Sequence, residues 1–175
     1  ARLDGWEDRA GTRHEIRAAQ LIRRGQTVTG ITLEHRFAIP DPRRPARFGP
    51  HERAILRADD GSLIVLFHSA SPETYGDSFA WVYAEGLTRR WAALETRAVE
   101  VVSSQQLRRN IPIRSWFHIL EPDIKGELTA TARAVDELPS DRGPQPYHAV
   151  YRVGGWIEFG GERQGVEGVL ERGEP

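Results

Sequence analysis

The sequence predicts an all-β protein, an antiparallel up-and-down β-barrel of about eight to ten strands, with a β-sandwich as the alternative. Three observations lead to this fold class. Short apolar segments alternate with polar residues along most of the 175-residue chain. Turns that contain glycine or proline separate these segments at nearly regular intervals. The last segment keeps its alternation almost to the C-terminus, and an ordered last strand needs a partner strand.

The first part of the chain holds a segment with two interpretations. The apolar residues of 13–24 are loosely compatible with a helix, whereas the β-branched run from Thr27 to Leu33 is typical of a strand. Gly25 lies at the break between them and indicates a hairpin turn. Residues 40–50, which are rich in proline, follow as a loop without periodicity.

The clearest hairpin comes next. Two apolar runs within 52–69 flank the sequence Asp59-Asp60-Gly61, and glycine can take the positive φ that such a turn requires. Residues 78–86 then alternate aromatic and small side chains, as a strand does. Residues 89–102 are ambiguous, because their first part fits a helix and their valine-rich end fits a strand.

The next elements are a strand that begins after Pro112 and a second strand that follows a turn at Gly126. Small residues dominate one face of the second strand. That face carries Leu128, Ala130, Ala132 and Ala134. Small side chains on an inward face would leave room inside a barrel.

The chain ends with a predicted hairpin over 147–173 that turns at Gly160-Gly161. We expect its last strand to pair with an early strand, which would close the barrel and remove both sheet edges. The glycines of this strand would allow a sharp bend at a barrel corner. The alternative is an ordinary edge strand that its glycines merely weaken.

Composition excludes several classes of function. A net charge of -1 argues against a nucleic-acid-binding protein, and no apolar run approaches the roughly 18 residues of a membrane span. The chain has no cysteine, so disulfides, thiolate metal sites and cysteine nucleophiles are impossible. The histidines are scattered without metal-ligand spacing, and no nucleotide-binding loop occurs. We therefore expect no metal and no cofactor. Redox chemistry does not decide the compartment, and the cytoplasm is the expected location.

Aromatic residues lie in or beside many of the predicted strands, where they could fill a core or line a cavity. A barrel of about eight strands is near the size at which the interior either packs solid or holds one ligand. We predict a cavity for a flat or elongated apolar molecule, with Tyr75 and Asp77 in a loop at the barrel mouth. The candidate ligand-binding residues are Phe37, Phe67, Tyr75, Asp77, Trp81, Tyr83, Trp116 and Trp156.

Polar groups interrupt the apolar faces of several predicted strands. A buried imidazole or carboxyl group could transfer a proton to or from an apolar substrate. The candidates for this role are His35, His68, His118 and Glu158. For each of them, the more common role of such a residue is that of a satisfied core group or a surface residue at a strand end.

From Trp81 onward, about half of the chain resembles a known family. The residues that carry the resemblance are "WVYAEG", "IPIRSWFHILEPDIKGELTATARA" and "YRVGGWIEFGGERQGVEGVLERG". Their order resembles that of the lipocalin-like carotenoid hydratase (hydroxyneurosporene synthase) and AttH superfamily. The resemblance implies a calycin-type barrel for apolar ligands, with relatives that include hydratases and cyclases of polyene or polyketide-like molecules. Members usually carry two such barrels, and this chain has the length of one.

Three functions are therefore open. The chain could be an enzyme that binds a polyene, terpenoid or polyketide-like molecule and promotes its cyclisation, isomerisation or hydration without a redox cofactor. It could be a lipocalin-like carrier or sensor of an apolar ligand that performs no chemistry. It could also be one half of a two-barrel protein rather than a single domain over 1–175. The expected partners are an apolar small molecule and either a second copy or a second barrel domain.

Overall fold

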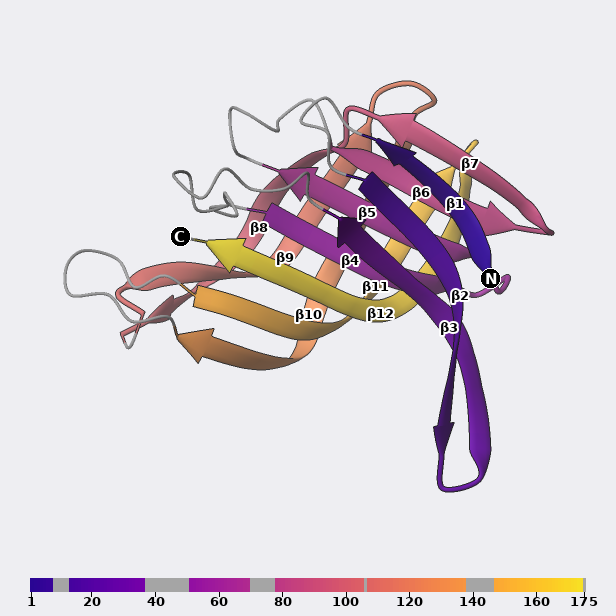
Figure 1. Ribbon diagram of the computed structural model, residues 1–175. Coiled ribbons are helices and arrows are strands. Elements are labelled where there is room, and N and C mark those ends of the chain that lie inside the picture. The colour runs from indigo at the N-terminus through magenta and orange to yellow at the C-terminus, as the bar shows by residue number, and fades with distance from the viewer. Residues whose placement is uncertain (8–12, 37–50, 70–77, 106, 138–146, 175) are drawn as a thin grey trace. The chain divides into compact units, whose positions relative to one another are not determined.

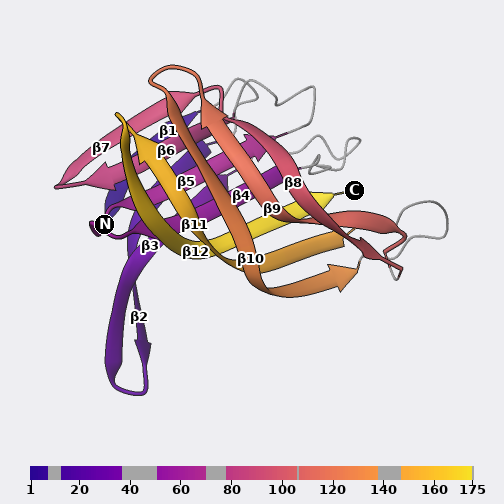
Figure 2. The same ribbon diagram turned by 180° about the vertical axis from the view of Figure 1, so that it is seen from behind.

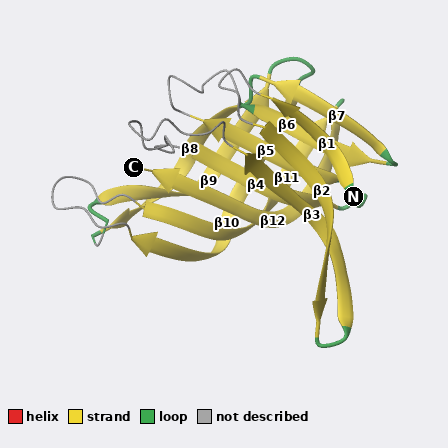
Figure 3. Cartoon of the chain, viewed as in Figure 1, coloured by secondary structure: helices red, strands yellow, loops and turns green. Residues whose placement is uncertain are grey.

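The computed structural model describes residues 1–7, 13–36, 51–69, 78–105, 107–137 and 147–174 (Figure 1). Within these ranges the chain forms strands and turns and contains no helix (Figure 3). No segment in them is a helix able to cross a bilayer. The all-β prediction is confirmed. The chain divides into two compact units, Ala1–Ala46 and Arg47–Pro175.

The first unit is a three-stranded antiparallel sheet in the order β1 (Arg2–Glu7), β2 (Arg13–Arg23) and β3 (Gln26–Arg36). The helix considered for 13–24 is wrong, because β2 and β3 form a hairpin. Arg24 and Gly25 make its two-residue turn with φ of 49° and 79°. Two left-handed residues match the twist of paired strands, so this turn favours a hairpin over a helix.

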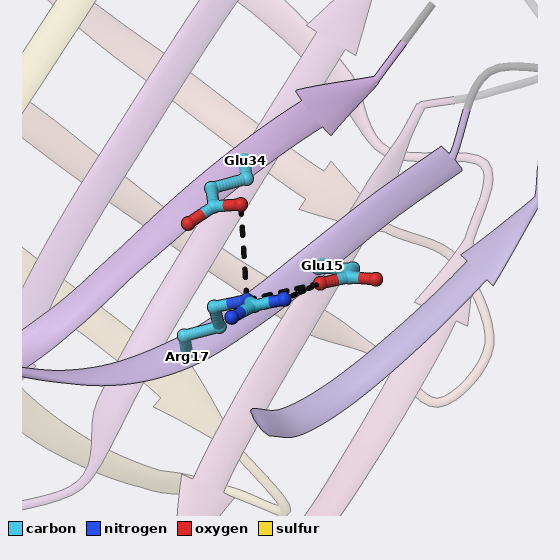
Figure 4. Close-up of polar contacts among 3 residues, drawn as sticks. All are labelled: Glu15, Arg17 and Glu34. Carbon is cyan, nitrogen blue, oxygen red and sulfur yellow. Dashed lines mark hydrogen bonds and ion pairs between the residues drawn. The ribbon is translucent and has the colours of Figure 1, made fainter. Parts of the chain in front are cut away.

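Charged side chains cross the face of β2 and β3 (Figure 4). Glu15 lies directly opposite Glu34, and two like charges in this position repel. Arg17 lies between them, with Nη2 2.6 Å from Glu15 and Nε 3.7 Å from Glu34. The hydrogen bond with Glu15, followed by the charges of both carboxylates, raises the pKa of Arg17. Arg17 thus offsets the repulsion between the two strands.

The second unit is one nine-stranded antiparallel sheet in the order β7-β6-β5-β4-β12-β11-β10-β9-β8. Its strands are β4 (His51–Ala58), β5 (Leu63–Ser69), β6 (Phe79–Ala84), β7 (Leu87–Ala92), β8 (Glu95–Ser104), β9 (Arg109–Ile119), β10 (Ile124–Glu137), β11 (Tyr147–Phe159) and β12 (Glu162–Glu174). The predicted hairpin turns at Gly61 and Gly160-Gly161 are present, each with positive φ.

The last strand lies in the middle of this sheet. Strand β12 pairs with β11 over its whole length and with β4 from Val166 to Gly173. The predicted pairing of the last strand with an early strand is therefore correct. The sheet is not closed, however, because no ladder joins β7 to β8 among the described residues. The prediction that both edges disappear is wrong.

The sheet coils so that its two halves face each other, and β9 and β10 cross in front of β4 and β5 in Figure 2. One face, called the inner face here, carries a buried cluster to which both halves contribute, from Ala54, Leu56, Ile64 and Leu66 to Phe117, Leu128, Val153 and Leu170. The opposite face is called the outer face. A lipocalin-like sheet wrapped around an apolar interior is the result.

Glycines in β11 and β12 make this coiling possible. A Cβ at Gly168 would clash with the carbonyl oxygen of Ile55 on β4, and a Cβ at Gly155 would clash with that of Glu127 on β10. The neighbouring backbones approach too closely for any side chain at these positions. The glycine-rich final strand is thus what the sharp curvature of the sheet requires.

A β-bulge changes the small-residue face predicted for β10. Ala130 pairs with Val153 and Ala132 pairs with Arg152, so Thr131 is an extra residue in the ladder. An extra residue reverses the direction of the side chains that follow it. Ala132 and Ala134 are consequently exposed on the outer face, and the prediction that they line the interior is wrong.

Two further boundaries differ from expectation. The turn expected at Gly126 lies earlier, between Ile119 and Ile124, and Gly126 is part of β10. The ambiguous residues 89–102 form the end of β7 and most of β8. Between those strands Ala93 has φ of 62°, and Leu94 is buried in the core cluster. A left-handed residue breaks a helix as well as a strand, and here it lets the chain leave the sheet at its corner.

Candidate functional site

The inner face encloses a cavity of about 270 Å³ near the tight hairpin turns. Its walls come from β4 to β7 on one side and from β10 to β12 on the other. The apolar lining residues are Ala58, Ile64, Val82, Ala84, Leu87, Trp91, Ile124, Ile157 and Phe159. The polar lining residues are Asp60, Ser62, Glu85, Arg89, Glu162 and Gln164. We call this space the wide cavity.

Two aromatic rings meet across the wide cavity. The rings of Trp91 on β7 and Phe159 on β11 lie 5.5 Å apart at 50°. These strands are not neighbours in the sheet, so a side-chain contact joins its two halves where no backbone ladder does. Phe159 and Leu87 are 41% and 63% exposed, which is unusual for large apolar side chains. Exposed apolar groups at the rim of a hollow are typical of a ligand site.

Carboxylates lie where the hairpin turns reach the cavity. Asp60 Oδ1 accepts a hydrogen bond of 2.8 Å from the backbone N–H of Ser62. This hydrogen bond is the main reason that the pKa of Asp60 is lowered, while burial acts in the opposite direction. Asp60 is therefore ionised at neutral pH and can accept hydrogen bonds from a ligand.

The inner face also carries a buried ion pair toward the opposite end of the sheet. Arg172 on β12 is 2% exposed, and its Nη2 donates to Glu52 Oε1 on β4 and to Ser115 Oγ at 3.1 Å. Its Nη1 donates to the carbonyl oxygen of Pro112 at 3.4 Å. This arrangement compensates the charge of Arg172 by hydrogen bonding within the fold.

His68 is the one proton-transfer candidate that the structure places beside this ion pair. Together with Glu52, Ser115 and Leu94 it borders a small cavity of about 20 Å³, whose surface is almost entirely apolar. His68 Nδ1 lies 3.1 Å from the carbonyl oxygen of Leu94 and 3.2 Å from Ser78 Oγ. Since a carbonyl oxygen only accepts hydrogen bonds, Nδ1 carries the proton in that contact. The small cavity has room for a methyl-sized group rather than for a substrate.

His118 and Glu158 lie on the outer face, in one row across β9, β10 and β11 with Lys125 between them. Lys125 Nζ is 2.9 Å from Glu158, and His118 Nε2 is 3.2 Å from Asp123. The hydrogen bond with His118, helped by Lys125, lowers the pKa of Asp123, and the contact with Glu158 raises the pKa of Lys125. The structure thus brings these two candidates together in a charged ladder and not beside the wide cavity.

The predicted aromatic ligand residues are also mostly on the outer face. Trp116 and Trp156 face the guanidinium groups of Arg97 and Arg163 at 4.7 Å and 3.6 Å. Trp116 additionally contributes to the lining of the small cavity. Such stacking is a favourable cation–π contact.

Phe67, Trp81 and Tyr83 follow the same pattern on β5 and β6. They alternate with inner-face residues such as Leu66 and Ala80. Phe67 stacks on Phe79 at 5.5 Å, and Trp81 stacks on Tyr83 at 6.3 Å. A role in ligand binding remains a prediction for all of these aromatic residues.

The remaining candidates have no described side chain. Phe37, Tyr75 and Asp77 lie outside the described residues, and of His35 only the backbone in β3 is described. Ser69 and Ser78, which flank residues 70–77, are joined by a 3.1 Å hydrogen bond from the backbone N–H of Ser69 to Ser78 Oγ. In the parts of the chain that the structure describes, no group of three or more potential metal ligands is found.

Sequence reasoning missed the residues that surround the wide cavity and form the buried ion pair. A signal for Arg172 was present, because Val166, Gly168 and Leu170 alternate on one face and Arg172 continues that series. The same alternation puts Glu52 on one face of its strand with Ala54, Leu56 and Ala58. No comparable signal marks Asp60 or Arg89, whose position depends on how the sheet coils.

The coiled antiparallel sheet and its internal cavity define a lipocalin-like fold. A protein assigned as AttH from Nitrosomonas europaea has a similar structure, with a TM-score of 0.56, 17% sequence identity, and coverage of 93% of this chain and 52% of the other. Kievitone hydratase from Nectria haematococca is similar with a TM-score of 0.60, 12% identity, and coverage of 93% and 50%. This chain therefore spans about half the length of these solved structures.

These similarities confirm, at the level of the fold, the resemblance to lipocalin-like proteins inferred from the sequence. No protein-family model matches the chain, and no curated protein matches it in sequence.

Proposed function

We propose that the protein binds a compact apolar small molecule in the wide cavity. The observation that carries this proposal is the cavity of about 270 Å³ between the two halves of the sheet, with apolar walls and a polar rim. Ligand sites in proteins are usually hollows of about 300–1,000 Å³ with this division between walls and rim. The volume supports a compact terpenoid or aromatic molecule better than a long polyene.

The reaction that we propose for this molecule is the addition or removal of water. Kievitone hydratase has a similar fold, and the wide cavity holds carboxylates, Asp60 and Glu162, of the kind that transfer protons to and from water. Cyclisation and isomerisation have no comparable support. A non-catalytic carrier is the alternative. We further propose that the chain is one barrel of a two-barrel protein, because the solved structures that it matches are about twice as long.

Cavity-filling variants test the binding site. The neutral probe naphthylmethanol should bind to the wild type, and Ala84→Phe on the cavity wall should weaken its binding by at least about tenfold. Ala134→Phe is the matched control, because Ala134 is exposed on the outer face of β10. Calorimetric titration measures both affinities, and circular dichroism checks the folding of each variant. Wild-type affinity in Ala84→Phe would contradict the proposed site.

Incubation with compact alkenes in ¹⁸O-labelled water tests the reaction. A hydratase gives alcohols that carry the label, which mass spectrometry detects. Binding of the same alkenes without labelled product would favour the carrier.

A further inference from the structure

The polar side chains of the wide cavity do not all have a partner among the residues that the structure describes. Asp60 accepts a hydrogen bond from Ser62, as described above. The side chain of Arg89 on β7, in contrast, makes no hydrogen bond or ion pair with any residue that the structure describes. Three carboxylates line the same cavity, and none of them is within ion-pair distance of Arg89.

The position of Arg89 follows from the alternation of an edge strand. Leu87, Arg89 and Trp91 share the face of β7 that lines the wide cavity, and Arg89, which is exposed, is flanked along the strand by two apolar lining residues. Its cross-strand neighbour on β6 is Val82, which is also part of the wall. Arg89 thus belongs to the middle of a strand that lines the cavity, whereas Asp60, Glu85 and Glu162 belong to hairpin turns or strand starts at the rim.

Guanidinium chemistry specifies the kind of group that such a residue binds. Arginine is always protonated, has five N–H donors in a planar fork and has no acceptor. A carboxylate or phenolate oxygen meets two of these donors at once, and a neutral hydroxyl meets one of them weakly. The aromatic pair of Trp91 and Phe159 next to it offers contact with a flat apolar body.

We infer that the guest of the wide cavity is amphipathic, a flat apolar body that bears a carboxylate or phenolate, and that Arg89 selects it by binding this group. The inference rests on the proposed function, since it concerns the ligand of the same cavity. The lining carries three carboxylates and one guanidinium, so its net charge alone would favour a cationic guest over the anionic guest that we infer. If the rim carboxylates governed selection, a cationic guest would bind best.

Three probes with the same ring system separate these possibilities, namely naphthoate, naphthylmethanol and naphthylmethylamine. We expect naphthoate to bind to the wild-type protein about fivefold more tightly than naphthylmethanol. A preference of this size lies between the free energy of an exposed ion pair and that of a buried hydrogen bond to a charged group. Arg89→Gln should abolish this preference, because it should weaken the binding of naphthoate much more than that of naphthylmethanol. Arg89→Lys should keep part of the preference, because the charge remains and the fork is lost.

Arg90→Gln is the matched control, because it removes the same charge from the neighbouring position of β7, whose side chain points to the other face. It should leave the order of the three affinities as in the wild type. Tighter binding of naphthylmethylamine than of naphthoate, or an unchanged preference in Arg89→Gln, would overturn the inference while leaving the cavity as a binding site. If none of the probes binds to the wild type, the proposed function fails, and the inference fails with it.

Discussion

The buried ion pair of Glu52 and Arg172 allows a sharp test of how the interior of the sheet is stabilised. Glu52→Gln keeps the shape of the side chain and removes its charge. Arg172, which is 2% exposed, would then be an uncompensated buried cation. Breaking a buried pair in this way costs about 3–5 kcal/mol. The side chain of Glu52 is 20% exposed, and Ser115 and Pro112 still accept hydrogen bonds from Arg172 in the variant. We therefore expect the free energy of unfolding to fall by about 3 kcal/mol, the lower end of this range.

The adjacent register position provides the control. Arg53 and Glu171 pair between the same two strands, β4 and β12, but on the outer face, with side-chain exposures of 25% and 23%. Glu171→Gln should cost less, about 1–2 kcal/mol, because Arg53 stays partly exposed to water when the pair is broken, whereas Arg172 is 2% exposed. Urea unfolding followed by circular dichroism measures both values. For a chain of this length, 3 kcal/mol corresponds to a fall in Tm of about 6–12 °C.

A double variant separates loss of the pair from loss of its charge balance. Glu52→Leu combined with Arg172→Met replaces both charges with apolar groups of similar size. The free energy of unfolding should return to within about 1 kcal/mol of the wild type or exceed it. The reasoning is refuted if Glu52→Gln costs no more than Glu171→Gln, or if the double variant is as unstable as the single one.

Two further predictions concern the curvature of the sheet and its response to acid. Gly168→Ala should lower the free energy of unfolding by more than about 3 kcal/mol, because its Cβ would clash with the backbone of Ile55, whereas Gly154→Ala, whose Cβ has no neighbour nearer than 3.9 Å, should cost less than about 1 kcal/mol in the same unfolding assay. Burial alone would raise the pKa of Glu171, but the hydrogen bond from His148 and the charge of Arg53 outweigh it and lower the pKa. Its contribution to stability is therefore present above the pKa of the unfolded chain and is lost as pH falls through the folded pKa, in the range below about pH 4, so Glu171→Gln should flatten the acid limb of a stability–pH curve. An acid limb of unchanged slope in Glu171→Gln, or equal costs for the two glycine variants, would contradict these accounts.

The elements that the sequence predicts well are those that local chemistry decides. The turns at Gly61 and Gly160-Gly161 require positive φ, and glycine between two apolar runs is a sufficient signal for them. The partner of the last strand was also predictable, because a strand that stays apolar on one face needs neighbours. The helix considered for 13–24 was wrong, because the apolar spacing of a short segment fits the period of a helix as well as that of a strand. Only the pairing with β3 decides between the two structures.

The site was harder to predict, because alternation gives two faces and does not say which one lies inside. On β6 the large residue Trp81 suggested the inner face, but the structure puts Ala80 and Val82 there. Small side chains fit where the two halves of a coiled sheet approach each other. The bulge at Thr131 is a second example, since a single extra residue moved Ala132 and Ala134 to the outer face without any mark in the sequence pattern.

The seam between β7 and β8 has a mechanical consequence. A barrel with continuous hydrogen bonds has a fixed circumference, so the width of its lumen cannot change without breaking a ladder. Here the described residues of β7 are held to the far side of the lumen by the contact of Trp91 with Phe159 and not by backbone pairing. An outward movement of β7 would therefore disturb the packing of Trp91 against Phe159 and the core cluster without breaking a backbone ladder at this seam, and the lumen can widen for a thicker guest at a lower cost than in a closed barrel.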